Sequence, residues 1–171
     1  MLQLVLMRHG KSDWDVSYGA DHDRPLAERG VRSARLMGRL LTEADQAPNL
    51  VVASTAVRAH RTALLAAESG GWDCEVVTDR AIYGANPRGV LEVVRLVAGH
   101  HRRVLVVGHE PTWSNLVFEL VGARVEMKTA SVAGVGLLID EWSSLPDATG
   151  WLDYLIHPRM FSGGDDRFDS D

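Results

Sequence analysis

The sequence predicts a three-layer α/β sandwich, in which a largely parallel sheet is flanked by helices on both faces. Short apolar runs alternate along the chain with longer segments whose apolar residues recur every three or four positions. The apolar runs also lack the strict alternation of a half-exposed strand, as expected when both faces of a strand are covered. Right-handed crossovers then bring the carboxyl ends of the parallel strands to one edge of the sheet.

Strands are expected where short apolar runs end at glycine, proline or polar residues. The first run extends from Leu2 to Met7 or Arg8 and is followed closely by Gly10. Further strands are expected at residues 50–54, 75–78, 103–107, 131–140 and 151–156. The last two flank a predicted turn at residues 146–150, so we expect them to pair antiparallel.

Four helices are expected, and most carry a recognisable start or stop signal. Ser54 or Thr55 is expected to cap the second helix, and Asn86 before Pro87 marks the start of the third. Glycines after the second and fourth helices are typical stop signals. The helices are expected at residues 27–43, from 54 or 55 to 67, 87–98, and from 111 or 112 to 121.

The composition favours one cytoplasmic domain. Residues 1–161 of the 171-residue chain are expected to form this domain, and the acidic tail at 162–171 is expected to be disordered. A net charge of −5 gives no signature of nucleic acid or membrane binding. The chain has one cysteine, no signal-peptide pattern at its start and no apolar run of about 18 residues, which together favour the cytoplasm. No oligomeric state is indicated.

Cationic and imidazole side chains follow three of the predicted parallel strands. Arg8 and His9 follow the first strand, Arg58 lies in the helix turn after the second, and His109 and Glu110 follow a later one. We therefore expect them at one edge of the sheet. Two arginines with a protonated His109 can neutralise the oxygens of a phosphoryl group, while a neutral His9 attacks phosphorus in line.

The position of Arg58 is unusual for a helix start. A cation in the first turn meets the positive end of the helix dipole, so its charge is unfavourable there. An anion bound between the helix end and the side chain would remove this conflict. A surface arginine without a functional role is the alternative.

Several segments resemble the histidine phosphatase superfamily, also called phosphoglycerate-mutase-like. They occur in the order expected for that family and extend over most of residues 2–120. The short chain and the continuation Lys11 to Trp14 are most similar to the SixA-type phosphohistidine phosphatase branch. The segments are Arg8-His9-Gly10, Asp23-Arg24-Pro25-Leu26, Glu28-Arg29-Gly30, Ser54 to Thr62, and Val106 to Pro111.

The resemblance implies a site that uses neither a metal nor a cofactor. His9 would be the phosphorylated nucleophile, and Arg8, Arg58 and His109 would form the phosphate pocket. Three neighbouring residues complete the substrate site that we expect: Gly10, Ser12 and Glu110.

Many members of the family carry a Glu or Asp general acid after the third strand, but residues 81–91 contain neither. Such an acid protonates an alkoxide leaving group and contributes about 10²–10⁴-fold to the rate. A protonated imidazole leaves more easily, so the lack of a general acid in this segment favours a phosphohistidine substrate. Glu110 is a substitute acid, although it could instead orient His109 or cap the next helix. Other substitute acids left open are Asp13, Asp79 and Glu92.

These observations predict a phosphatase that acts on phosphohistidine in proteins. One competing function is a small-molecule phosphomonoesterase, and another is a non-catalytic module that binds phosphate or phosphoprotein. The polar loop at residues 11–24 is expected either to contact the substrate or to form plain surface.

Overall fold

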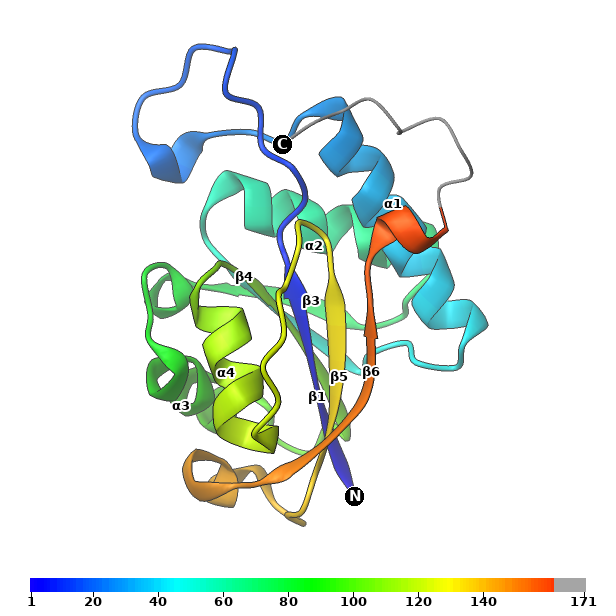
Figure 1. Ribbon diagram of the computed structural model, residues 1–171, viewed down its shortest axis with the longest axis vertical. Helices are drawn as coiled ribbons and strands as arrows, with labels where there is room; N and C mark the ends of the chain where they lie inside the picture. Colours follow the sequence, from blue (N-terminus) through cyan, green and yellow to red (C-terminus); the bar gives the residue numbers. More distant parts are fainter. Residues whose placement is uncertain (162–171) are drawn as a thin grey trace.

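A six-stranded mixed sheet forms the centre of the computed structural model, which describes residues 1–161 (Figure 1). The strand order is β3-β2-β4-β1-β5-β6. The predicted acidic tail at residues 162–171 lies outside the described residues. The strands are β1 (Leu2–Arg8), β2 (Leu50–Ser54), β3 (Glu75–Asp79), β4 (Arg103–Gly108), β5 (Val132–Leu137) and β6 (Gly150–Ile156).

Strand β1 occupies an interior position, parallel to β4 on one side and antiparallel to β5 on the other. Strand β2 pairs in parallel with both β3 and β4, so the first four strands in the sheet order run in one direction. Strands β5 and β6 pair antiparallel, as the sequence predicted. The carboxyl ends of β1, β2 and β4 therefore share one edge, where the chain leaves β1 at the upper end of Figure 1.

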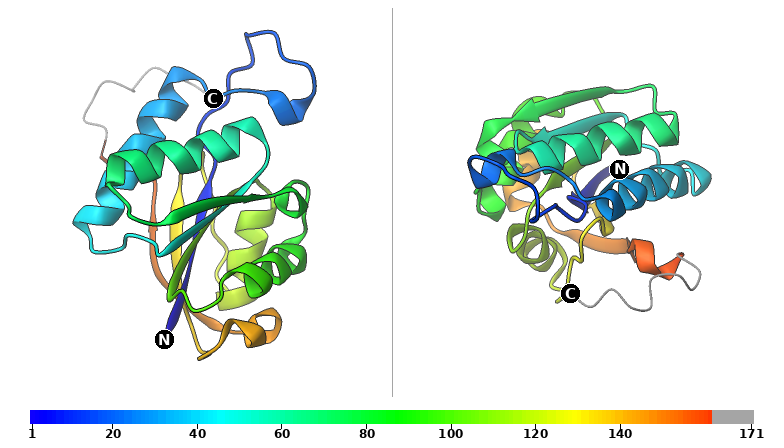
Figure 2. Two further views of the ribbon diagram at one scale, coloured as in Figure 1. Left: turned by 180° about the vertical axis from the view of Figure 1, so that it is seen from behind. Right: turned by 90° about the horizontal axis from the view of Figure 1, so that it is seen from above.

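Within residues 1–161, four α-helices cover the two faces of the sheet (Figure 2). Helices α1 (Glu28–Glu43) and α2 (Val57–Gly70) pack on one face. Helices α3 (Pro87–Val97) and α4 (Thr112–Val121) pack on the other. The predicted three-layer α/β sandwich is confirmed.

Both faces of β1 are fully covered. Leu4 and Leu6 contribute to the core beneath α3 and α4, whereas Val5 and Met7 contribute to the core beneath α1 and α2. All four side chains are completely buried. This explains why the strand is apolar at successive positions, as expected for a parallel strand between two helix layers.

The predicted cap of α2 is wrong. The helix begins at Val57, and its N-cap is Ala56, whose side chain makes no capping hydrogen bond. The Ser54 hydroxyl instead contacts the backbone N–H of Ala56 and the His109 ring, while the Thr55 hydroxyl contacts His22. Both polar side chains are therefore used at the strand edge rather than at the helix start.

The segment between β5 and β6 also differs from the prediction. Strand β5 ends at Leu137 rather than near Asp140, and a 3₁₀ helix, η3 (Trp142–Asp147), precedes β6. Trp142 and Leu145 are buried in the core under α3 and α4, and the Trp142 indole N–H donates to the carbonyl of His101 at 2.6 Å. Burial of these two side chains draws the segment inward. Within residues 1–161, no helix is both long and apolar enough to cross a membrane.

Candidate active site

Four segments that are distant in sequence meet at the carboxyl edge of the parallel strands. His9 follows β1, His109 follows β4, and Arg58 is the second residue of α2. The fourth segment is the short 3₁₀ helix η1 (Asp21–Asp23), within the loop that joins β1 to α1. The structure therefore brings together the side chains that the sequence placed at this edge.

His9 is buried, and hydrogen bonds on both sides of its ring fix its orientation. Its Nδ1 lies 2.7 Å from the carbonyl oxygen of Gly10. Because a carbonyl can only accept, Nδ1 must carry the ring proton. Nε2 then holds a lone pair, and the Nε–H of Arg58 donates to it at 3.3 Å. The tautomer partner that sequence could not identify is thus a backbone carbonyl.

The surroundings keep His9 neutral. Burial lowers the pKa of His9 to about 3, and the positive charges of Arg58 and Arg8 act in the same direction. The hydrogen bond to the Gly10 carbonyl acts in the opposite direction but does not outweigh them. At neutral pH the ring therefore carries a nucleophilic lone pair on Nε2.

Arg58 is buried, and Asp21 binds its guanidinium group. Nη1 donates to the backbone carbonyl of Asp21 at 2.6 Å, and Nη2 donates to the Asp21 carboxylate at 2.9 Å. The sequence predicted that an anion would compensate this cation at the start of α2. In the structure that anion is the Asp21 side chain.

The Asp21 carboxylate accepts hydrogen bonds from two arginines and from one tyrosine hydroxyl. Burial acts to raise its pKa, but hydrogen bonds from Arg24 and Tyr83, together with Arg58, lower it to about 2. The Tyr83 hydroxyl donates to Asp21 at 3.0 Å, and Arg24 donates at 2.8 Å through Nη2. Asp21 is therefore a carboxylate at neutral pH and a poor proton donor.

The His109 ring faces His9, with ring centroids 5.2 Å apart. Its Nε2 lies 2.9 Å from the Ser54 hydroxyl, and its buried Nδ1 has no hydrogen-bond partner among the described residues. Burial is the main cause that lowers the pKa of His109 to about 4, with Arg58 contributing. His109 is therefore neutral at neutral pH, and the protonated His109 expected from the sequence is wrong. A neutral ring can still donate one N–H.

Arg8 lies at the other side of the β1 end. Its Nη1 donates to the carbonyl of Met127 at 2.9 Å, and its charge contributes to lowering the pKa of both His9 and His109. Arg8 also lines a pocket between α1 and the chain after α4. It therefore borders both the histidine pair and this pocket.

The remaining predicted site residues support the loops around the histidines. The Gly10 N–H donates to Thr62 at 3.0 Å, and a Cβ at Gly10 would lie only 2.7 Å from the carbonyl oxygen of Gly30 in α1. The Ser12 hydroxyl accepts from Arg24 at 2.5 Å.

The Glu110 carboxylate accepts from the backbone N–H of Ser114 at 3.1 Å, at the start of α4. This contact is the helix-capping role that the sequence left open. Burial raises the pKa of Glu110.

Several residues at this edge were missed by sequence reasoning. The length of the loop at residues 11–24 marks it as a candidate substrate contact, but no sequence signal identifies Asp21 as the residue that reaches Arg58. The sequence predicts a helix-capping role for Ser54 rather than its contact with His109, and it gives no signal for Tyr83. The described residues contain no cluster of three or more His, Cys, Asp or Glu side chains able to hold a metal ion.

Comparisons with known proteins point to one family. The model of the histidine phosphatase superfamily (branch 1) matches residues 4–83. An uncharacterized protein of Mycobacterium tuberculosis is 41% identical over 127 residues, which cover 74% of this chain and 76% of the relative.

Two solved structures match nearly the full chain. The first, assigned as the phosphohistidine phosphatase SixA of Nakamurella multipartitia, is 31% identical with a TM-score of 0.79, covering 92% of this chain and 96% of that one. The second is the protein histidine phosphatase SixA complexed with tungstate, which covers 93% of this chain and 99% of that one. It has a TM-score of 0.79 and, at 23% identity, supports the fold alone.

Proposed function

Because the chain belongs to the histidine phosphatase superfamily, whose members are enzymes of phosphatase or mutase type, we propose that it is a phosphatase working through a phosphohistidine intermediate on His9. We further propose that its substrate is phosphohistidine in a protein. The observation that carries the proposal is the fixed tautomer of His9, which leaves Nε2 unprotonated beside Arg58.

In the first step, Nε2 of His9 attacks phosphorus as the bond to the leaving group breaks. The incoming phosphoryl group replaces the hydrogen bond between Arg58 Nε and His9, so that this N–H can donate to a phosphoryl oxygen. The buried Nδ1 of His109 supplies a second donor. Arg8 adds positive charge beside the transferred group, and together these residues stabilise the equatorial oxygens.

In the second step, a water molecule attacks phosphorus and the bond to Nε2 breaks. His9 regains its lone pair, and inorganic phosphate leaves with the protons of the attacking water. Arg58, His109 and Arg8 hold the oxygens as in the first step, so one set of donors serves both transfers. No step requires a metal ion or a cofactor.

The acidic groups near the site favour a leaving group that needs little help from a general acid. Asp21 is ionised, because its pKa is lowered to about 2. Glu110 has a raised pKa, but its carboxylate caps α4. A phosphohistidine substrate releases imidazole, whose nitrogen can take its proton from solvent, whereas a sugar or alkyl phosphate requires proton donation to an alkoxide.

The experiment combines labelling with substrate profiling. Wild-type protein incubated with a labelled phosphohistidine peptide is expected to acquire acid-labile, alkali-stable phosphate, and the His9→Ala variant is expected to acquire none. The phosphohistidine peptide should also give a higher kcat/KM than any member of a panel of phosphorylated metabolites. Stable labelling of the His9→Ala protein would exclude the nucleophile assigned here.

Two other results would select the competing functions. A metabolite hydrolysed faster than the peptide would identify a small-molecule phosphomonoesterase. Binding of phosphate without turnover of para-nitrophenyl phosphate would identify a non-catalytic module. The intact pocket of Arg8, His9, Arg58 and His109 argues against the second outcome, because a binding module does not need a nucleophile.

A further inference from the structure

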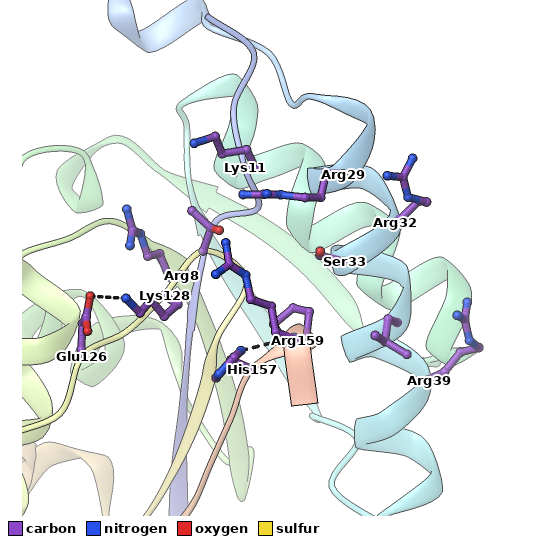
Figure 3. A pocket seen from close by; sticks show the side chains of 13 residues that line it. Arg8, Lys11, Arg29, Arg32, Ser33, Arg39, Glu126, Lys128, His157 and Arg159 are labelled. Atoms are coloured by element: carbon purple, nitrogen blue, oxygen red, sulfur yellow. Dashed lines mark hydrogen bonds and ion pairs between the residues drawn. The ribbon is translucent and has the colours of Figure 1, made fainter. Parts of the chain in front are cut away.

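A strongly basic pocket of about 490 Å³ lies next to the active site, and Arg8 lines both (Figure 3). One wall is α1, and the opposite wall comes from residues 126–129 and from the short 3₁₀ helix η4 (Pro158–Met160). In Figure 3, Arg29 and Arg159 lie between these walls, with Lys128 beyond them. The pocket therefore continues the phosphate site along the surface of α1.

Cations are concentrated here far beyond their share of the sequence. The chain carries 18 lysines and arginines and a net charge of −5, yet seven of these cations line this one pocket. Both lysines of the chain, Lys11 and Lys128, are among them. Among residues 1–161, Glu126 is the only acidic residue in the lining. A locally positive surface on an acidic protein indicates a binding site for anions.

Two of the cations that line this pocket form ion pairs with nearby carboxylates. Lys128 pairs with Glu126 at 2.7 Å, and Arg32 pairs with Glu28 at 3.6 Å. Both pairs are solvent-exposed, so each contributes little free energy.

The pocket is too long for the phosphoryl group alone. Arg29, Arg32 and Arg39 line it from one helix, and ten residues of an α-helix rise about 15 Å. An extended peptide rises about 3.3 Å per residue, so this length matches about four or five residues. In Figure 3, Arg32 and Arg39 lie on the side of α1 that is farther from Arg8 and Lys128.

We propose that this pocket binds acidic residues that flank the phosphorylated side chain of a protein substrate. This inference rests on the proposed phosphatase function and specifies its substrate class. Carboxylates of the bound segment contact Lys128 and Arg159 while the phosphoryl group occupies the donors around His9. Since these cations are exposed, they act mainly on substrate capture, and the effect appears in KM and is weakened by salt.

The test uses two phosphohistidine peptides that differ only in flanking residues, acidic in one and the matching amides in the other. Wild-type kcat/KM should be at least about tenfold higher for the acidic peptide at low salt, with the ratio falling toward one at high salt. In the Lys128→Glu/Arg159→Glu protein, the ratio of kcat/KM for the acidic peptide to that for the amide peptide should be at least about tenfold lower than in wild type. The control Arg95→Glu/Arg102→Glu makes the same change in net charge near the opposite edge of the sheet, at half-buried Arg95 and exposed Arg102, and should preserve the ratio.

Binding of an unphosphorylated acidic peptide separates this inference from the proposed function. If neither phosphohistidine peptide is hydrolysed but the acidic peptide binds to wild type and not to Lys128→Glu/Arg159→Glu, the pocket is supported and the phosphatase proposal fails. Equal wild-type kcat/KM for both peptides would overturn the proposed role of the pocket. So would an equal loss of the ratio between the two peptides in the Arg95→Glu/Arg102→Glu control. So would tight binding of tripolyphosphate without binding of the acidic peptide, which would assign the pocket to small polyanions.

Discussion

The contact between Arg58 and His9 has two roles at the scale of single residues. Arg58 Nε donates to the His9 lone pair that attacks phosphorus in the proposed mechanism. In the proposed mechanism, the arginine holds the ring in place before the substrate arrives, and its N–H then donates to a phosphoryl oxygen of the bound substrate. Asp21 holds the other guanidinium nitrogens throughout, so the group need not reorient.

Replacing Arg58 tests this arrangement directly. The Arg58→Ala protein is expected to lose at least about tenfold in kcat, because it lacks a donor to the transition state. Arg58→Lys keeps the charge but cannot bind Asp21 and His9 through a planar fork, so we expect it to restore only part of the rate. The rate of para-nitrophenyl phosphate hydrolysis gives kcat for both variants. Unchanged kinetics in Arg58→Ala would remove this residue from the site.

The Asp21 carboxylate is expected to position Arg58 at the expense of phosphate affinity. In Asp21→Asn, kcat should fall at least about threefold because the guanidinium is held less firmly. Inorganic phosphate should inhibit more strongly, since a negative charge near its site is gone. Tyr83→Phe, which removes only one hydrogen bond to Asp21, serves as the control and should change both quantities less. A kcat equal to wild type in Asp21→Asn would refute the positioning role.

At the scale of elements, the close approach of α1 to the loop after β1 explains two glycines. A Cβ at Gly30 would lie 2.2 Å from the carbonyl oxygen of Lys11, and one at Gly10 would meet the backbone of Gly30. These contacts involve backbone atoms, which cannot move aside as a flexible side chain can. The helix therefore fixes the loop that carries His9.

The two glycine positions near helix starts give a matched pair of predictions. Gly30→Ala should lower the free energy of unfolding by about 1–3 kcal/mol and reduce kcat, because the loop must shift. Gly89→Ala in α3 meets only ordinary contacts at 3.4 Å and beyond, so it should stabilise by up to about 1 kcal/mol through helix propensity. Urea unfolding of both variants provides the measurement. Equal stability of the two would show that the approach of α1 is not rigid.

The sequence predicted the regular elements well and the irregular ones poorly. Apolar runs located β1 and β4, and Asn86 before Pro87 located the start of α3, because these signals act locally. The 3₁₀ helices η1 and η3 were not predicted, since they depend on tertiary contacts. The same distinction applies to the site. Residues directly after strands were identified, whereas Asp21 required knowledge of how its loop folds back onto α2.

At the scale of the whole molecule, the active site depends on the completed sheet. Residue Gln3 of β1 pairs with Arg103 of β4, and only this long-range pairing places His9 beside His109. Contacts of such sequence separation form late and together with the rest of the fold. We therefore expect loss of the active site and loss of tertiary structure to occur in one transition.

The pKa values of the two buried histidines differ between the folded and the unfolded protein, so the free energy of unfolding depends on pH. Burial lowers the pKa of His9 to about 3 and that of His109 to about 4, whereas both rings titrate near 6.5 in an unfolded chain. Between these values the unfolded state binds more protons, so the free energy of unfolding falls as pH falls. The stabilisation is complete above pH 6.5 and is lost progressively below it, by at most about 1.4 kcal/mol per pH unit for each histidine.

Urea unfolding between pH 7 and pH 5 should therefore show decreasing stability. The raised pKa of Glu110 acts in the opposite direction, because its folded form binds the proton more readily, and so reduces the slope. Asp21, with its pKa lowered to about 2, contributes only at lower pH and lies outside this window. The His9→Gln/His109→Gln protein lacks both titrating rings and should show a smaller dependence. A slope identical to wild type would mean that the two histidines do not carry the acid sensitivity of the fold.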